Sequence, residues 1–201
     1  MVARASSARL VQRTGLLLVG CLLSTVCYAV TIRASLGLGP LYAVQDGLAS
    51  LLHISIGRSV MVVGVGLILG AVVLRSWPGP GTVALPFIGG ATLDALLPHM
   101  PELHGSALRL VAVIVASWLM GLGGALMITA RVGVAALDAV MLGFQRIFQR
   151  PLGTTRLAME ATMLITGWLL GGAVGVGSVI TGLLIGPSMQ FWLHRASLKR
   201  Q

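Results

Sequence analysis

Charged side chains are scarce in this sequence, and acidic ones are the scarcest. Asp and Glu number five, Lys and Arg fourteen, and charged residues make up 9% of the 201 positions. Soluble globular domains carry roughly 25% charged residues, so a soluble enzyme is excluded because its surface could not be covered. Hydrophobic residues reach 56% with a mean hydropathy of +0.95, which excludes a disordered chain. The composition indicates an integral membrane protein.

Cysteine and the usual catalytic groups are also nearly missing. The two cysteines, Cys21 and Cys27, fall on different faces of one apolar helix, which excludes an intrahelical disulfide. His99, Glu102 and His104 share a proline-containing loop that lacks the preset geometry of a metal site. No Ser/His/Asp or Cys/His arrangement is apparent. We therefore expect no enzyme activity, no catalytic residues, no metal and no cofactor.

The basic residues outnumber the acidic ones and give a formal net charge of +9; all of them are Arg except Lys199. They lie mainly at both ends of the chain and in a few connections. This is typical of Arg retained on the cytoplasmic side of a membrane, next to anionic lipid. We therefore expect the lipid bilayer as a partner, and no nucleic acid. The predicted location is the bacterial cytoplasmic (inner) membrane, with both termini in the cytoplasm.

The chain matches itself at an offset of 96 residues, which lays residues 13–94 over 109–190 without a gap. We interpret this as an internal duplication, because glycines coincide far more often than chance allows. The coinciding pairs are Gly37/Gly133, Gly47/Gly143, Gly57/Gly153, Gly79/Gly175, Gly81/Gly177 and Gly90/Gly186. The predicted parts are a basic N-terminus (1–12), a first membrane repeat (13–97), a loop (98–108), a second membrane repeat (109–193) and a basic tail (194–201).

Each half is predicted to hold three long helices and one short broken helix, in an all-α membrane fold. The short segments, 40–52 and 136–148, would reach only about 20 Å as helices, against a hydrocarbon core of roughly 30 Å. A glycine break precedes each of them, at Gly37 and at Gly133. The long helices are expected at 14–32, 59–74 and 82–97, and at 110–130, 157–173 and 178–193.

Two topologies fit these segments. If the short segments dip into the membrane and return, there are six crossings, the second half is inverted, and Arg33, Arg58 and Arg109 lie outside. If the short segments span, there are eight crossings in parallel halves, and Arg33, Arg75 and Arg131 lie outside. Both arrangements keep the same number of basic residues inside, so the positive-inside rule does not separate them. Segment length favours the inverted arrangement.

The glycine motifs also resemble those of the YczE/YyaS/YitT family of bacterial membrane proteins, over nearly the whole chain. The resemblance implies this fold, whereas the function of the family is largely undetermined. An acidic residue commonly follows the Gly-Pro element in the family; Asp138 holds that place in the second half and Tyr42 in the first. The motifs are Leu36-Gly37-Leu38-Gly39-Pro40, Val132-Gly133-Val134-Ala135-Ala136-Leu137-Asp138, Ser55-Ile56-Gly57, Gly79-Pro80-Gly81-Thr82 and the glycine-rich run 171–178.

The paired glycine breaks are the strongest pointer to a binding site. Secondary transporters often bind substrate at interrupted helices in matching positions of two halves. A helix N-terminus in a low dielectric presents N–H groups and a positive dipole end, which favours an anionic or zwitterionic ligand. The alternative is that glycine only permits close packing and a tight turn. The candidates are Gly37, Gly39, Pro40 and Gly133.

Charged residues within membrane segments point to function by default. The further substrate-binding candidates of this kind are Asp46, Arg58, Asp138, Arg156 and Glu160. If Asp46, Asp138 and Glu160 face a central cavity, they would bind a cation or a proton. Each group also has an ordinary explanation: Asp138 would offset a helix dipole, and Arg156 and Glu160 would pair at i,i+4.

Two functions are carried forward. The first is a transporter or permease that binds a small solute between the two repeats. The second is a non-transporting membrane scaffold, sensor or assembly factor that acts through a protein partner. A transporter should contain a hydrated cavity beside the charged residues, whereas a scaffold should be solidly packed there. The small-residue motifs, such as Gly66-x-x-x-Gly70, also allow a homo-oligomer.

Overall fold

The chain is all-helical in a computed structural model that describes residues 2–133, 135–149 and 152–198. Within these residues it forms eight α-helices and one short 3-10 helix, η1 (Leu97–His99), with no strand. The α-helices are α1 (Val2–Ala34), α2 (Pro40–Leu52), α3 (Ile56–Val73), α4 (Pro80–Leu96), α5 (Ser106–Ala130), α6 (Ala136–Phe148), α7 (Leu152–Leu169) and α8 (Val176–Leu198).

Five segments of the described chain are long and apolar enough to cross a membrane. Helix α7 is 18 residues long but does not qualify, since it carries Arg156 and Glu160 as well as several threonines. Helices α2 and α6 have 13 residues each and are too short to span in a regular way. The qualifying segments are Leu10–Ala34, Ile56–Val73, Pro80–His99, Ser106–Ala130 and Val176–Ala196.

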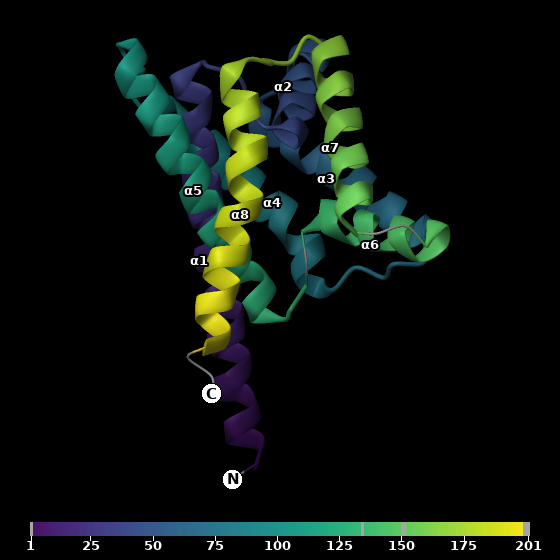
Figure 1. Ribbon diagram of the computed structural model, residues 1–201. Helices are drawn as coiled ribbons and strands as arrows, with labels where there is room; N and C mark the ends of the chain where they lie inside the picture. Colours follow the sequence, from purple (N-terminus) through teal and green to yellow (C-terminus); the bar gives the residue numbers. More distant parts are fainter. Residues whose placement is uncertain (1, 134, 150–151, 199–201) are drawn as a thin grey trace.

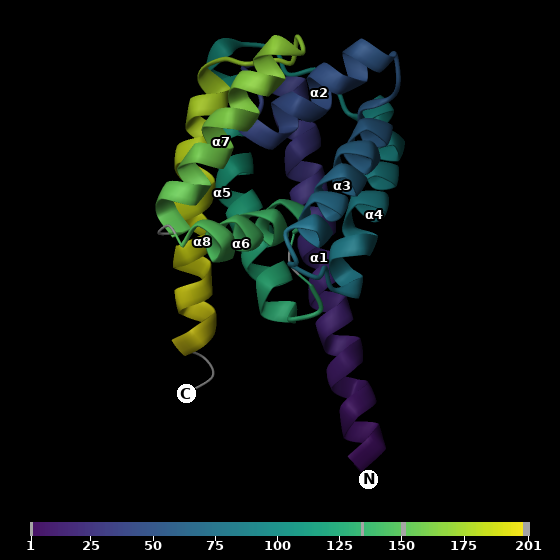
Figure 2. The same ribbon diagram turned by 90° about the vertical axis from the view of Figure 1, so that its right-hand side faces the viewer.

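The long helices run alternately up and down along one long axis (Figure 1), and α1 begins at the same end of the molecule as that at which α8 ends. Helix α1 rises from that end and α5 descends beside it, so the two are antiparallel neighbours. Helix α4 packs against α1, and α8 packs against α5. Helices α2 and α6 lie at different heights in the bundle (Figure 2), where α2 contacts α7 and α6 contacts α3.

The predicted bounds of the two short helices agree with the structure residue for residue. Pro40 stands at the first position of α2, where its missing N–H is not needed, and Gly39 precedes it as N-cap. All six long helices begin before their predicted first residues, whereas α3, α4 and α7 end before their predicted last residues, α7 at Leu169 against a predicted 173. Helix α1 begins at Val2 and α8 continues to Leu198, so residues 2–13 and 194–198 are helical extensions of the predicted spans.

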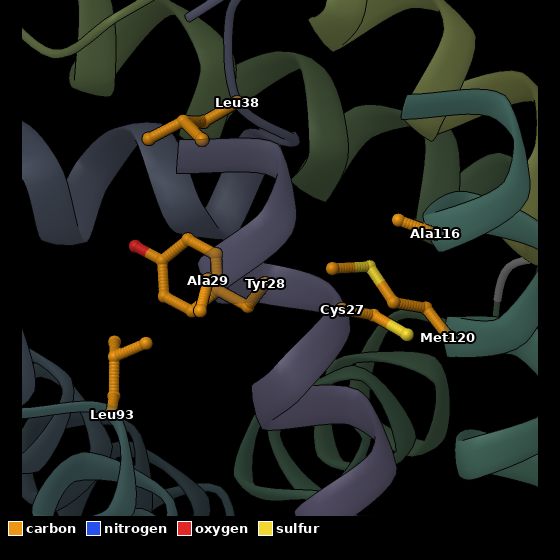
Figure 3. Close-up of a cluster of buried hydrophobic side chains, with 7 residues drawn as sticks. All are labelled: Cys27, Tyr28, Ala29, Leu38, Leu93, Ala116 and Met120. Carbon is orange, nitrogen blue, oxygen red and sulfur yellow. The ribbon is translucent and has the colours of Figure 1, made fainter. Parts of the chain in front are cut away.

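Small residues let α1 and α5 approach closely at the centre of the bundle. A Cβ atom at Gly20 would lie 2.6 Å from the backbone oxygen of Gly123, and a Cβ at Gly123 would lie 2.8 Å from the oxygen of Gly20. Above this crossing lies a buried cluster (Figure 3) in which Tyr28 of α1 and Leu93 of α4 face the short helix α2. Its other members are Cys27, Ala29, Leu38, Ala116 and Met120. Close packing is what holds helices together in lipid.

Buried hydroxyl groups join α5 to α8. The Ser188 hydroxyl donates to the backbone oxygen of Trp118 at 2.6 Å. The hydroxyl groups of Ser117 and Thr181 lie 3.2 Å apart, and both residues are fully buried. Because a hydroxyl without a partner is costly in an apolar interior, these bonds define the register between the two helices.

We expect Gly123→Ala to destabilise the fold by about 1–3 kcal/mol, because the added methyl group overpacks the α1–α5 crossing. Gly66→Ala is the matched control: a Cβ at Gly66 meets no atom within 4 Å, so the gain in helix propensity, about 1 kcal/mol, should dominate. Reversible unfolding in mixed detergent micelles would measure both. Equal effects of the two substitutions would contradict close packing at Gly123.

Candidate functional site

Each glycine break is hydrogen-bonded to a loop in the other half of the chain. The N–H of Gly177, at the start of α8, donates to the oxygen of Leu36 at 2.7 Å. The N–H of Gly81, at the start of α4, donates to the oxygen of Val132 at 3.3 Å. The two donors, Gly81 and Gly177, are 96 positions apart, and so are the two acceptors, Leu36 and Val132. The breaks therefore fix where α2 and α6 begin relative to the opposite half.

The glycines in these breaks are required by close backbone approach. Gly37 has φ of +103°, a conformation that L side chains rarely adopt. A Cβ there would lie 2.8 Å from the Cα of Gly175. A Cβ at Gly133 would lie 2.6 Å from the backbone nitrogen of Thr82. These two sequence candidates thus position the short helices, and neither lines the cavity described next.

A cavity of about 180 Å³ lies between the first turns of α2 and α6 and is also lined by α1, α5, α7 and α8. Five of the nine predicted site residues line it, namely Gly39, Pro40, Asp138, Arg156 and Glu160. They come from both halves of the chain, which the sequence places about a hundred residues apart. Tertiary packing therefore brings the glycine break of the first half to the charged residues of the second half.

The N-terminus of α2 meets this cavity without a side-chain cap. Gly39 makes no capping hydrogen bond, and the first helical backbone bond runs from the N–H of Ala43 to the oxygen of Gly39 at 2.8 Å. The N–H groups of Leu41 and Tyr42 precede that bond, and both residues line the cavity. The positive end of the helix dipole therefore acts on the cavity.

A charged trio, defined here as Asp138, Arg156 and Glu160, forms the opposite wall. Arg156 Nε and Glu160 Oε1 are 2.9 Å apart, so the predicted i,i+4 ion pair is present on α7. Asp138 stands in the first turn of α6 and lines the same cavity. All three residues also border a void of about 20 Å³, which has room for one water molecule.

The energetics of Asp138 depend on the two competing effects of its position. An acid in the first turn of a helix gains about 0.3–1 kcal/mol from the dipole. An uncompensated charge costs up to about 2.5–3.5 kcal/mol at the centre of a membrane helix, whereas Asp138 stands in the first turn of the short helix α6. The guanidinium of Arg156, which borders the same void, is already bonded to Glu160. Among the described residues, Asp138 therefore has the helix dipole but no cation of its own.

The remaining acidic residues of the membrane helices are used in backbone hydrogen bonds. Asp46, a predicted site residue, accepts from the N–H of Ala173 at 2.8 Å and so ties α2 to the α7–α8 loop. Asp94 accepts from Ser55 Oγ at 2.6 Å and from the N–H of Gly57 at 2.8 Å. Arg58, also predicted, is exposed in the first turn of α3. Neither Asp46 nor Arg58 lines the cavity.

Sequence reasoning missed the uncharged polar residues of the site. Ser24, Tyr42 and Thr181 line the cavity, and Thr181 is fully buried. A second cavity of about 150 Å³ lies beside it, bordered by Gln45 and Tyr28, and shares Ser24 and Tyr42 as wall residues. The Tyr28 and Tyr42 rings stack with centroids 3.9 Å apart. The only available signal was Tyr42, which occupies in the first half the position of Asp138 in the second.

A larger hollow of about 840 Å³ lies away from these polar groups. Phe144 and Phe148 of α6 stack along it with ring centroids 5.7 Å apart, and Leu67 of α3 and Met163 of α7 complete an apolar lining. Thr154, Thr155 and Thr162 are the polar members of its lining, and no charged residue in the described part of the chain borders it. We therefore place the candidate site at the smaller cavity, where polar groups converge.

The fold and the cavity define a helical membrane protein in which a glycine break precedes a short helix in each half of the chain. A model of a family of unknown function, DUF6198, matches residues 11–194, and the chain belongs to this family. Among its relatives, an uncharacterised protein of Haemophilus influenzae is 27% identical over 167 residues, covering 81% of this chain and 75% of the relative. The uncharacterised membrane protein YczE of Bacillus subtilis is 26% identical, covering 81% and 76%.

The uncharacterised protein YyaS of Bacillus subtilis is 24% identical over 179 residues, covering 87% of this chain and 89% of the relative. These matches confirm the resemblance to YczE and YyaS that the glycine motifs indicated. No solved structure matches the chain. The relatives thus support a membrane protein and carry no information about a solute.

We expect Gly37→Ala to destabilise the protein more than Gly105→Ala. Both glycines have positive φ, +103° and +89°, so both substitutions introduce backbone strain. A Cβ at Gly105 meets no atom within 4 Å, whereas a Cβ at Gly37 overlaps Gly175. The overlap should add about 1–3 kcal/mol, measured by unfolding in mixed micelles. If the two variants were equally stable, the Gly37–Gly175 contact would not hold α2 in place.

Proposed function

We propose that the protein is a bacterial inner-membrane transporter that binds a small solute between two inverted repeats. In this proposal α1, α3 and α4 cross the membrane in the first half, and α5, α7 and α8 in the second. Helices α2 and α6 enter the membrane without spanning it. Both termini lie in the cytoplasm, next to most of the basic residues.

Three observations support the inverted duplication. Helices α2 and α6 cover 40–52 and 136–148, and α3 and α7 begin at Ile56 and Leu152, each pair offset by 96 positions. The backbone bonds Gly177 to Leu36 and Gly81 to Val132 are related by that offset, with the halves exchanged. Helices α1 and α5 run antiparallel (Figure 1), as inversion requires.

The observation that carries the proposal is the cavity beside the charged trio. Dense packing would have favoured a scaffold, whereas a cavity lined by both halves favours a solute site. Its volume of about 180 Å³ is near the roughly 150 Å³ of an engineered protein cavity that holds benzene. The solute is therefore small, with about six to eight non-hydrogen atoms by that comparison.

The chemistry of the walls favours a zwitterionic solute over a simple anion. The uncapped start of α2 suits a negatively charged group. Asp138 and Glu160 on the opposite wall suit a positively charged one. A simple anion would meet two carboxylates in the same small space, which like-charge repulsion opposes.

The inverted topology predicts opposite labelling of two loops. In a background without Cys21 and Cys27, which are both buried, single cysteines would replace exposed Trp77 and Glu102. We expect a membrane-impermeant thiol reagent to label Trp77→Cys from the cytoplasm and Glu102→Cys from outside. The reverse pattern would mean eight crossings in parallel halves, and the proposed site between inverted repeats would be lost.

Solvent access to the cavity separates a transporter from a scaffold. Gly182 of α8 lines the cavity, and a Cβ there meets no atom within 4 Å. We expect Gly182→Cys to react with a small, charged, membrane-impermeant thiol reagent in proteoliposomes. Gly186→Cys is the matched control, one turn away, equally open around its Cβ but outside the cavity lining. An unreactive Gly182→Cys from both sides would contradict transport through this cavity.

A further inference from the structure

The charges that line the cavity do not balance. Asp138 and Glu160 are acidic and Arg156 is basic, and no other charged residue among the described residues borders the cavity. With all three groups ionised, the trio carries one net negative charge in a partly buried site, where the side chains of Arg156 and Glu160 are 34% and 27% exposed. A buried charge without a partner is costly, and proteins avoid it by binding a counter-charge.

We propose that Asp138 binds one proton, which brings the charged trio to zero net charge. The proton adds to the Asp138 carboxylate and forms a neutral carboxyl group, with no other bond made or broken. Glu160 already has a cationic partner, because Arg156 Nε is bonded to its Oε1 at 2.9 Å. Asp138 takes the proton because no hydrogen bond from another described residue reaches its carboxylate. It interacts with Arg156 and Glu160 through charge alone, across the void.

The surroundings of Asp138 favour a proton over a metal cation. The void that the trio borders has about 20 Å³ and is otherwise lined by Leu137, Met141 and Met159, which offer no side-chain oxygen. Hard cations need about six or more oxygen ligands. The two carboxylates cannot supply them, since Glu160 is engaged with Arg156. A proton needs no coordination shell.

The cavity beside Asp138 is bordered by groups from several neighbouring helices. Helix α7 supplies Arg156 and Glu160, and α2 supplies the Tyr42 phenol to the same cavity. Helices α1, α5 and α8 contribute the uncharged Ser24, Met120 and Thr181. Helices α3 and α4, which also contact α6, place no charged residue at this cavity. Among the described residues, Arg156 is thus the one cation that can replace the proton as partner of Asp138.

The proton site deepens the proposed function, because it would supply the coupling ion for the solute in the same cavity. A solute that brings its own positive charge to Asp138 would displace the proton, and Arg156 could then keep its pairing with Glu160. The proton itself can be tested without any solute. Its presence or absence is therefore decided independently of transport.

The test is the pH dependence of folding stability in mixed micelles, measured as the ratio of folded to unfolded protein. The folded protein holds a proton that the unfolded chain has already released, so stability falls as pH rises. One such proton lowers the folding constant about tenfold per pH unit. Asp138→Asn cannot hold the proton. We expect the ratio of wild-type to Asp138→Asn folding constants to fall about tenfold per unit between pH 5 and 8.

Two further variants keep the proposal open to refutation if Asp138→Asn fails to fold. Glu160→Gln leaves Asp138 with Arg156 as a neutral pair, so the pH dependence should disappear there as well. Arg156→Gln leaves two carboxylates without a cation. The pH dependence of stability should then rise towards a hundredfold change in the folding constant per pH unit. Asp94→Asn is the control, because Asp94 is bonded to Ser55 and Gly57. It should lower stability and keep the wild-type slope.

Three results would overturn the proposal. The first is a wild-type slope that equals those of Asp138→Asn and Glu160→Gln. The second is an Arg156→Gln slope no steeper than that of the wild type. The third is stabilisation of the wild-type protein by NaCl over choline chloride at constant pH, lost in Asp138→Asn, because it would assign the site to sodium.

Discussion

The exchange of backbone hydrogen bonds between the glycine breaks and the opposite loops is the constraint on which the site depends. Helices α2 and α6 are too short to be placed by the membrane itself, so their first turns must be located by contacts. The bonds from Gly177 to Leu36 and from Gly81 to Val132 do this. Only residues without a side chain allow backbones to approach so closely. The cavity exists because these two first turns are held apart at fixed positions.

Polar groups elsewhere in the bundle follow from the cost of leaving them without partners in lipid. Asp46 and Asp94 are both satisfied by backbone N–H groups at chain turns, Asp46 by Ala173 and Asp94 by Gly57. Each thereby stabilises a connection between elements. The charged trio differs, since one guanidinium faces two carboxylates and the surrounding side chains are apolar. Among the described acidic residues of the membrane helices, only Asp138 and Glu160 line the cavity between α2 and α6.

Local features were predictable from the sequence, and features that depend on packing were not. Helix bounds at Pro40 and Ala136 follow from glycine and proline chemistry, and the Arg156–Glu160 pair follows from helical spacing. Asp138 stands in the first turn of its helix and Asp46 does not, but nothing local shows which of the two borders a cavity. Asp46 lies beside the α7–α8 loop and Asp138 beside the first turn of α2 because of how the halves pack. The uncharged wall residue Thr181 was missed for the same reason, since threonine in an apolar helix has no pattern of its own.

The proposed duplication makes the differences between the halves informative. Asp138 borders a cavity with charged walls, while Tyr42, at the matching position, stacks on Tyr28 and contributes to a neighbouring cavity without charged residues. Under inversion the two positions would be interchangeable if their chemistry were the same. Because aspartate and tyrosine differ in chemistry, the charge is confined to the half that carries α6 and α7. A solute or proton bound there would interact with one half through charge and with the other through the α2 helix end, so relative movement of the halves would change its binding.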